Sequence, residues 1–124
     1  MTDGYTLSPI KTEQATAEKY DEGKLRYDLL PPDALEELIR VYNLGANKYS
    51  DRNWEKGMDY GRIFAALQRH LWEFWKGEDR DEESNLLHLA HAAWGCLALS
   101  AYIIRGIGAD DRKLTEEPNV PKPK

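Results

Sequence analysis

The sequence predicts an all-α fold, a small helical bundle with flexible N- and C-terminal tails. Apolar residues recur with a helical period in the middle of the chain, and no segment alternates as a half-buried strand would. The 124 residues suffice for one domain. We expect residues 1–18 and 108–124 to be flexible segments, because both are polar and lack a period. Residues 19–107 should form a single helical domain.

An arm is expected before the first helix. Residues 19–32, KYDEGKLRYDLLPP, are dense in charge and contain Gly23 and a Pro-Pro pair. Glycine and proline interrupt regular structure, so this segment should be extended or looped.

The first helix should begin at Asp33 and end between Gly45 and Tyr49. Asp33 can accept hydrogen bonds from the first backbone N–H groups, and Glu36 follows three residues later, as in a capping box. Apolar side chains then follow helical spacing: Leu35, Leu38, Ile39 and Tyr42. Residues 50–58 should form a polar connection that contains Trp54.

The second helix should run from about Asp59, as its N-cap, to Lys76, with Gly77 as the stop. Its apolar face includes one histidine, His70, which should therefore point inward. The residues on this face are Ile63, Leu67, His70, Leu71 and Phe74.

The third helix should start near Asp81 or Ser84 and continue to about Arg105. It carries no charged side chain between Ser84 and Ile104. A helix that is apolar all round is surrounded by other helices, and two partner helices hardly suffice. We therefore expect part of it to lie in a homo-oligomer interface, in a dimer or a larger assembly.

Charge and cysteine content exclude several classes of protein. The net charge is −5, whereas proteins that bind nucleic acid through its phosphates are usually basic, so no nucleic-acid partner is expected. No apolar stretch approaches the roughly 20 residues of a membrane span. The single cysteine, Cys96, excludes an internally disulfide-bonded scaffold, and the N-terminus does not resemble a signal peptide. We expect an intracellular protein without a membrane partner.

Three histidines are candidates for chemistry. His88 and His91 are three residues apart and share a helix face. If the second and third helices are antiparallel, His70 could join them. Neutral imidazole is a common metal ligand. The alternative is three buried histidines that satisfy backbone groups or each other.

An acidic turn connects the two histidine-bearing helices. Carboxylates bind hard cations such as Mg²⁺, and histidine together with carboxylate also suits Mn²⁺, Zn²⁺ or Fe²⁺. The alternative is a solvated turn whose acids favour a helix N-terminus. The candidate carboxylates are Glu78, Asp79, Asp81 and Glu83.

Scattered cations and a loop with aromatic residues could bind a nucleotide. The cations could gather a polyanion such as a triphosphate, although each could equally be ordinary surface charge. They are Lys19, Lys24, Arg26, Lys48 and Arg69. Tyr49, Asn53 and Trp54 lie in a connection, where an aromatic ring could stack on a base or cap the bundle.

Three blocks in this order resemble a known family. They are KYDEGKLRYDLLPP, GANKYSDRNWEKG and ALQRHLWEFWKGEDRDEESNLLHLAHAAW. Together they are similar to the phage-encoded dATP/dGTP diphosphohydrolase domain, whose pattern is close to KxDxGKxR, GAxKYGxxNWxxG and ALxRHLxxFxxGEDxDxExGLxHLxHA. The resemblance covers about residues 19–102. The chain departs from the pattern at Ser50 and Asn85, where glycine is usual.

The resemblance implies hydrolysis of dGTP or dATP to the monophosphate and pyrophosphate, in phage nucleotide metabolism and in the cytoplasm of the infected host cell. It further implies a likeness to the MazG-like all-α pyrophosphohydrolases, which are oligomeric and Mg²⁺-dependent. Those enzymes carry ExxE and ExxD pairs on neighbouring helices. The pairs at this spacing here are His70-x-x-Glu73 and His88-x-x-His91.

These observations together define the expected site. A divalent ion, Mg²⁺ or Mn²⁺ with Zn²⁺ and Fe²⁺ left open, should be held by His70, Glu78, Asp81, His88 and His91. The catalytic carboxylates should be Glu78, Asp79, Asp81 and Glu83. Phosphate should contact Lys19, Lys24, Arg26, Lys48 and Arg69, and the base should contact Tyr49, Asn53 and Trp54. Two alternatives stay open: a non-catalytic nucleotide-binding or adaptor module, and a triphosphohydrolase that releases nucleoside and triphosphate.

Overall fold

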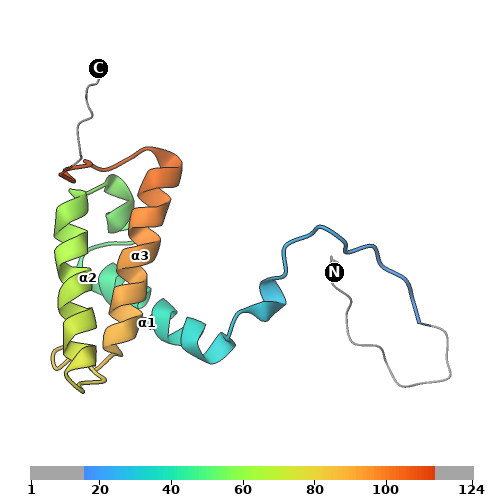
Figure 1. The fold of residues 1–124 in the computed structure, drawn as a ribbon, viewed down its shortest axis with the longest axis horizontal. Coiled ribbons are helices and arrows are strands. Elements are labelled where there is room, and N and C mark those ends of the chain that lie inside the picture. The colour runs from blue at the N-terminus through green and yellow to red at the C-terminus, as the bar shows by residue number, and fades with distance from the viewer. Residues whose placement is uncertain (1–15, 114–124) are drawn as a thin grey trace. The chain divides into compact units, whose positions relative to one another are not determined.

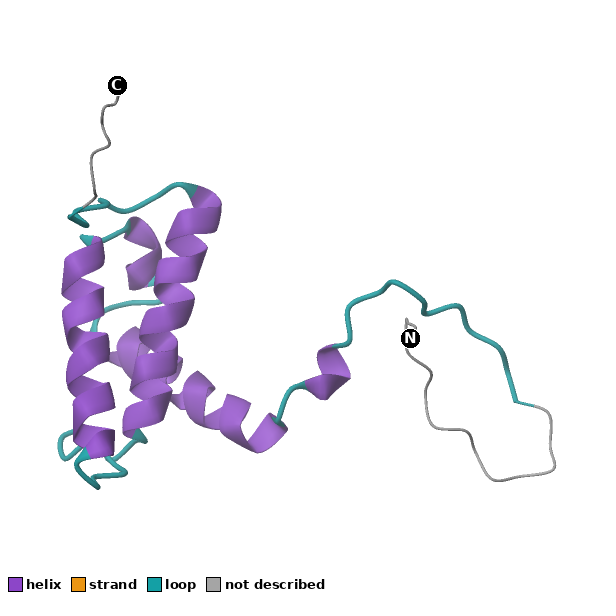
Figure 2. Ribbon diagram, in the orientation of Figure 1, coloured by secondary structure: helices purple, strands orange, loops and turns teal. Residues whose placement is uncertain are grey.

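The computed structural model describes residues 16–113, and its regular structure there is entirely helical (Figure 2). The all-α prediction is therefore confirmed. The elements in chain order are the 3₁₀ turn η1 (Tyr27–Leu29), α1 (Pro32–Lys48), the 3₁₀ turn η2 (Asn53–Lys56), α2 (Tyr60–Trp75) and α3 (His88–Arg105). Most of the expected tails, residues 1–15 and 114–124, lie outside the described residues.

The chain divides into two compact units, Met1–Pro31 and Pro32–Lys124. The described part of the first unit is the expected arm. Its chain reverses at a turn in which the Lys24 N–H donates to the Asp21 carbonyl at 3.0 Å. Gly23 lies in this turn with φ +83°, a left-handed conformation that glycine adopts without strain. The arm is therefore looped, as predicted.

Helices α2 and α3 lie side by side and antiparallel, as expected from the short connection between them (Figure 1). Their contact is centred on Ile63 of α2 and Ala98 of α3, which are 3% and 0% exposed. Gly95 allows the close approach, since a Cβ there would lie 3.2 Å from the Leu67 Cβ. Helix α1 packs against α3.

An aromatic cluster joins the 50–58 connection to the helices. The Trp54 ring stacks on Tyr102 with centroids 6.2 Å apart, and Tyr42 of α1 meets Trp54 edge-on at 6.1 Å. The Tyr102 hydroxyl, fully buried with its side chain, donates to the Trp54 carbonyl at 2.5 Å. Trp54 therefore takes part in the packing that links α1 and α3.

The predicted limits of the first helix are confirmed to within one residue. Helix α1 begins at Pro32, which lacks the N–H that a first helical residue would leave unpaired. The expected N-cap, Asp33, lies inside the first turn, where its Oδ1 accepts from the neighbouring Ala34 N–H at 2.8 Å. The prediction of Asp33 as the N-cap is therefore wrong by two positions.

The start of α2 is held by a part of the chain that follows α3. Asp59 occupies the expected N-cap position, but its side chain makes no capping hydrogen bond. Instead, Oδ1 of Asp111 accepts from the Gly61 N–H at 2.8 Å, and the Ala109 carbonyl accepts from the Tyr60 N–H at 2.9 Å. The first residues of the segment expected as a C-terminal tail are thus hydrogen-bonded to the bundle.

The predicted start of the third helix is wrong. Helix α3 begins at His88, not near Asp81 or Ser84. Asn85 has φ +61°, which a right-handed helix cannot contain, and Leu87 is extended. The side chains of Asp81 and Ser84 hydrogen-bond within the preceding turn, and such local bonds compete with helix formation.

Much of the apolar surface of α3 is solvent-exposed in the single chain. The side chains that are more than 40% exposed are Leu89, Leu97, Ile103 and Ile104. No helix in the described part of the chain has the length and hydropathy needed to cross a membrane.

Candidate metal centre

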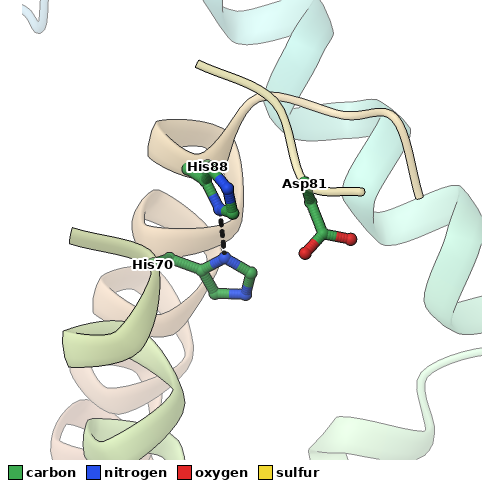
Figure 3. Close-up of side chains that lie close together, drawn as sticks. All are labelled: His70, Asp81 and His88. Carbon is green, nitrogen blue, oxygen red and sulfur yellow. Dashed lines mark hydrogen bonds between the residues drawn. The ribbon is translucent and has the colours of Figure 1, made fainter. Parts of the chain in front are cut away.

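Two histidines and one carboxylate from three different segments converge at one end of the α2–α3 pair. His70 comes from α2, His88 from the first position of α3, and Asp81 from the turn between them (Figure 3). One ring nitrogen of each histidine and one carboxylate oxygen of Asp81 all lie within 4.8 Å of one another. This is the geometry of a candidate site for a metal ion.

The two imidazoles are already in contact. Nδ1 of His70 and Nδ1 of His88 are 2.9 Å apart, so they share one proton, one ring donating and the other accepting (Figure 3). His88 is 5% exposed and His70 is half-buried. The antiparallel helices thus bring the histidines together as expected, with the Nδ1 atoms of His70 and His88 adjacent to each other.

His91 lies beside this group and is not among its three members. Its ring stacks on that of His70, with centroids 4.4 Å apart and an angle of 7° between the planes. Its Nε2 is 2.8 Å from Oγ of Ser84. Its expected role as a metal ligand stays a prediction, and its contacts suit a residue that holds the His70 ring in place.

The turn before α3 is closed by Ser84. The Ser84 N–H donates to Oδ2 of Asp81 at 2.8 Å, and the Leu86 N–H donates to Oγ of Ser84 at 3.2 Å. Oγ of Ser84 also lies 2.8 Å from Nε2 of His91. Ser84 therefore connects the carboxylate to the histidine cluster. Sequence reasoning missed this role, since a serine in a turn carries no distinctive signal.

The protonation states suit cation binding. Burial lowers the pKa of His70, and the neighbouring imidazoles of His91 and His88 lower it further. Burial likewise lowers the pKa of His91, against the opposing effect of Asp81. Burial raises the pKa of Asp81, but the Ser84 hydrogen bonds and the nearby histidines outweigh it, so this pKa lies below the usual range. These shifts favour the neutral form of His70 and His91 and the ionised form of Asp81.

The other expected carboxylates are in the same turn but outside the group. Glu78, Asp79 and Glu83 are exposed, whereas Asp81 is half-buried. The Asp79 backbone carbonyl accepts from the His88 N–H at 2.9 Å, which satisfies the first donor of α3. The structure thus selects one of the four acids for the cluster, and the catalytic role of the others stays a prediction.

Three of the five expected phosphate-binding cations meet in the arm. Lys19, Lys24 and Arg26 line one open cavity of about 260 Å³, together with Asp21, Leu25 and Asp28. Arg26 is committed to a bidentate ion pair with Asp28, at 2.8 and 2.6 Å. The two lysines are therefore the stronger candidates for a phosphate group in this cavity.

The other two expected cations lie on the bundle, at separate places. Lys48 is the last residue of α1, and its Nζ lies 5.6 Å from the centroid of the Tyr49 ring. Arg69 is an exposed residue of α2, next to His70, and its charge contributes to the lowered pKa of that histidine.

The residues expected to bind the base differ in accessibility. Tyr49 is 65% exposed and its ring is available for stacking. Asn53 begins η2, and Trp54 belongs to the aromatic cluster, with the Arg105 guanidinium 5.3 Å from its ring centroid. Trp54 therefore packs on the bundle, which agrees with the alternative that an aromatic ring of this connection caps it. Base binding by Tyr49, Asn53 and Trp54 stays a prediction.

The fold and the cluster together define a small all-α protein with a two-histidine, one-carboxylate candidate metal centre. The chain belongs to the family described as "dATP/dGTP diphosphohydrolase, N-terminal", whose family model matches residues 14–112. It is 37% identical over 98 residues to a protein of Salmonella phage PMBT28 named "dATP/dGTP diphosphohydrolase". That match covers 79% of this chain and 33% of the phage protein, so the chain spans about a third of its relative's length.

No solved structure shows a significant match to the chain. The expected likeness to MazG-like enzymes therefore stays a prediction. The departure from the family pattern at Asn85 has a local explanation, because this residue adopts the left-handed conformation that glycine reaches at least cost. Asparagine is the side-chain-bearing residue that tolerates this conformation best, together with aspartate.

Proposed function

We propose that this protein is a metal-dependent hydrolase that cleaves dGTP or dATP to the monophosphate and pyrophosphate, in phage nucleotide metabolism. The observation that carries the proposal is the convergence of His70, Asp81 and His88 in a chain of this family. The name of the phage relative supplies the substrate class. The relative is three times as long as the match, so the activity of this chain requires its own test.

The residues of the cluster have distinct tasks in this proposal. His70, Asp81 and His88 would hold a divalent ion, because they offer two ring nitrogens and an ionised carboxylate within one coordination sphere. The ion, when bound, would supply a Lewis acid for water and for the α-phosphate. Ser84 would hold the Asp81 carboxylate in position through its N–H.

Acids and cations outside the cluster complete the proposed reaction. An exposed carboxylate of the turn, from Glu78, Asp79 or Glu83, would accept the proton of the attacking water. Lysine charges would balance the phosphates as pyrophosphate leaves.

The test is a panel of ribo- and deoxyribonucleoside triphosphates, incubated with Mg²⁺ or Mn²⁺ and resolved by ion-exchange chromatography. We expect dGMP or dAMP with one pyrophosphate per turnover. The variant His88→Ala should lose turnover, and the variant Ser100→Ala, whose hydroxyl bonds only the Cys96 carbonyl of its own helix, should retain it. Full activity of a folded His88→Ala protein would remove the cluster from the mechanism.

A second candidate is a non-catalytic nucleotide-binding module. It is favoured by the one-third coverage of the phage relative, since the hydrolytic residues of that protein could lie in its other two thirds. This candidate predicts binding of dGTP or dATP by calorimetry without release of pyrophosphate. The same panel distinguishes the triphosphohydrolase alternative, which would release nucleoside and inorganic triphosphate.

We also propose that α3 associates with a second copy of the chain. Four large apolar side chains of this helix are exposed, and no charged residue interrupts it between Ser84 and Ile104. Burial of each such side chain is worth about 1.5–3 kcal/mol. Light scattering coupled to gel filtration should show a dimer or larger assembly, and the variant Ile104→Glu should shift it toward the monomer. A monomeric wild-type protein would contradict this.

A further inference from the structure

We propose that the His70–Asp81–His88 cluster binds an ion of the first transition series, such as Mn²⁺, Fe²⁺, Co²⁺ or Zn²⁺, in preference to Mg²⁺. The inference deepens the proposed function, because it names the kind of ion that the same site would use. It is tested through ion binding, so its failure can be distinguished from failure of the hydrolase proposal.

The donor set is the first argument. Two of the three donors are imidazole nitrogens and one is a carboxylate oxygen. Mg²⁺ dehydrates reluctantly and is bound through carboxylates, phosphates and water. Imidazole suits Zn²⁺ and Fe²⁺, whereas carboxylate and water suit Mg²⁺. Mn²⁺ has the lowest affinity of the transition ions named, and two histidines with one carboxylate form the known three-ligand arrangement of non-haem Fe²⁺.

The contact between the two histidines is the second argument. Their Nδ1 atoms are 2.9 Å apart. Two nitrogens at right angles around one ion, each about 2.1 Å from it, would lie about 3.0 Å apart. The separation of the two nitrogens therefore suits a single ion, and ion binding requires loss of the shared proton. Asp81 is within reach of the same point, since its oxygen lies within 4.8 Å of both nitrogens.

The surroundings of the ligands are the third argument. His88 is buried, His70 is stacked against His91, and Asp81 is fixed by the Ser84 N–H. Ligands that are ordered before binding lose little conformational entropy when the ion arrives. Partners of this kind around metal ligands typically change metal affinity by about 10–100-fold when removed. Ser84 is thus a positioning residue for the site.

The three protein ligands also leave coordination positions open. A structural zinc site closes its tetrahedron with four protein ligands, whereas a site with three leaves room for water or substrate. Among the residues that the structure describes, His70, Asp81 and His88 form the one such group of metal-binding side chains. The arrangement therefore points to an ion that meets a ligand from solution.

The experiment uses the full-length chain, freed of metal with a chelator and titrated with Mn²⁺ while free Mn²⁺ is followed by electron paramagnetic resonance. We expect one Mn²⁺ per chain, and no displacement by a 100-fold excess of Mg²⁺. Zn²⁺ or Co²⁺ at equal concentration should displace Mn²⁺, in accordance with the usual order of affinities.

Variants locate the bound ion. His88→Ala and Asp81→Asn should each weaken Mn²⁺ binding by at least tenfold. Asp81→Asn keeps an oxygen that can accept from the Ser84 N–H, so it provides the test if His88→Ala fails to fold. Ser84→Ala keeps the backbone N–H that donates to Asp81 and removes only the hydroxyl beside His91, so it should weaken binding less than His88→Ala does. Ser100→Ala is the matched control and should bind as the wild-type protein does.

Three outcomes would overturn the inference: no Mn²⁺ binding, displacement of Mn²⁺ by an equal concentration of Mg²⁺, or unchanged binding in folded His88→Ala and Asp81→Asn proteins. Mn²⁺ binding at this site without hydrolysis of any nucleotide would contradict the proposed function alone. Hydrolysis that both variants abolish, combined with displacement of Mn²⁺ by an equal concentration of Mg²⁺, would contradict the inference alone.

Discussion

The N-terminus of helix α2 is capped by a carboxylate fifty residues away in the sequence, and this contact makes a quantitative prediction. Oδ1 of Asp111 accepts from the Gly61 N–H at 2.8 Å. The adjacent Asp59 occupies the N-cap position without making a side-chain capping bond. The perturbation is therefore Asp111→Ala, which removes the carboxylate that accepts from the Gly61 N–H. The Asp59 side chain does not make this bond.

The expected loss follows from the kind of bond. Removal of a side-chain oxygen that caps a helix costs about 0.5–2 kcal/mol, with about 1 kcal/mol typical. Gly61 is exposed, so water can reach its N–H once the carboxylate is gone, and the full penalty for a buried unpaired donor does not apply. We expect a loss of about 1 kcal/mol, which lowers the Tm of a 60–100-residue domain by about 4–8 °C.

The assay is thermal unfolding followed by circular dichroism at 222 nm. Asp111→Asn retains an oxygen acceptor and should keep most of the stability. Asp110→Ala is the matched control: it removes the same charge one residue earlier, where the carboxylate pairs with Arg112 at 2.6 Å in an exposed ion pair. Such pairs contribute little, so the Tm should hardly change.

The reasoning would be refuted if Asp111→Ala left the Tm unchanged. It would also be refuted if Asp110→Ala lowered the Tm by the same amount, because the effect would then come from charge and not from the capping bond. A Gly61→Ala variant provides an independent check. Its added Cβ would lie 2.9 Å from Oδ2 of Asp111 and should shift this carboxylate. Because alanine favours a helix over glycine, the Tm should fall less than in Asp111→Ala.

Three further predictions concern acid stability, the aromatic cluster and the arm. Burial lowers the pKa of His70, so this histidine binds a proton at a higher pH in the unfolded chain than in the folded one. The Tm of the metal-free protein should therefore be constant above about pH 6.5 and fall at lower pH. A His70→Gln variant whose Tm falls by the same amount would contradict the assignment to His70. Tyr102→Phe removes the donor to the Trp54 carbonyl and should cost about 1–3 kcal/mol in urea unfolding, whereas an unchanged midpoint would show that water replaces the hydroxyl. Lys24→Ala should weaken dGTP binding in calorimetry without changing the Tm, because this exposed lysine lines the arm cavity; unaltered affinity would exclude the cavity as a phosphate site.

The accuracy of the sequence predictions depended on the range of the interactions involved. The limits of α1 and α2 follow from apolar spacing and from the glycine at position 77, all within a few residues, and they were predicted nearly correctly. The start of α3 was predicted four to seven residues too early. Asp81 and Ser84 are typical helix N-cap residues, but here they hydrogen-bond each other inside a turn.

The candidate site shows the same division. The spacing of His88 and His91, and the inward position of His70, indicate from sequence that the imidazoles converge if the second and third helices are antiparallel. The four acids of the turn were equivalent on composition. Only the folded turn shows that Asp81 points into the cluster while its acidic neighbours remain exposed.

The sequence by itself determined that this protein is helical, which face of α2 is buried, and to which family it belongs. Helical periodicity and family motifs are properties of neighbouring residues along the chain, so they can be read without a structure. Tertiary structure alone decided that Asp81 joins the histidines, that Ser84 holds it, and that Asp111 caps α2. These contacts join side chains to groups on other segments, and they form only once α2 and α3 have packed and brought those segments together.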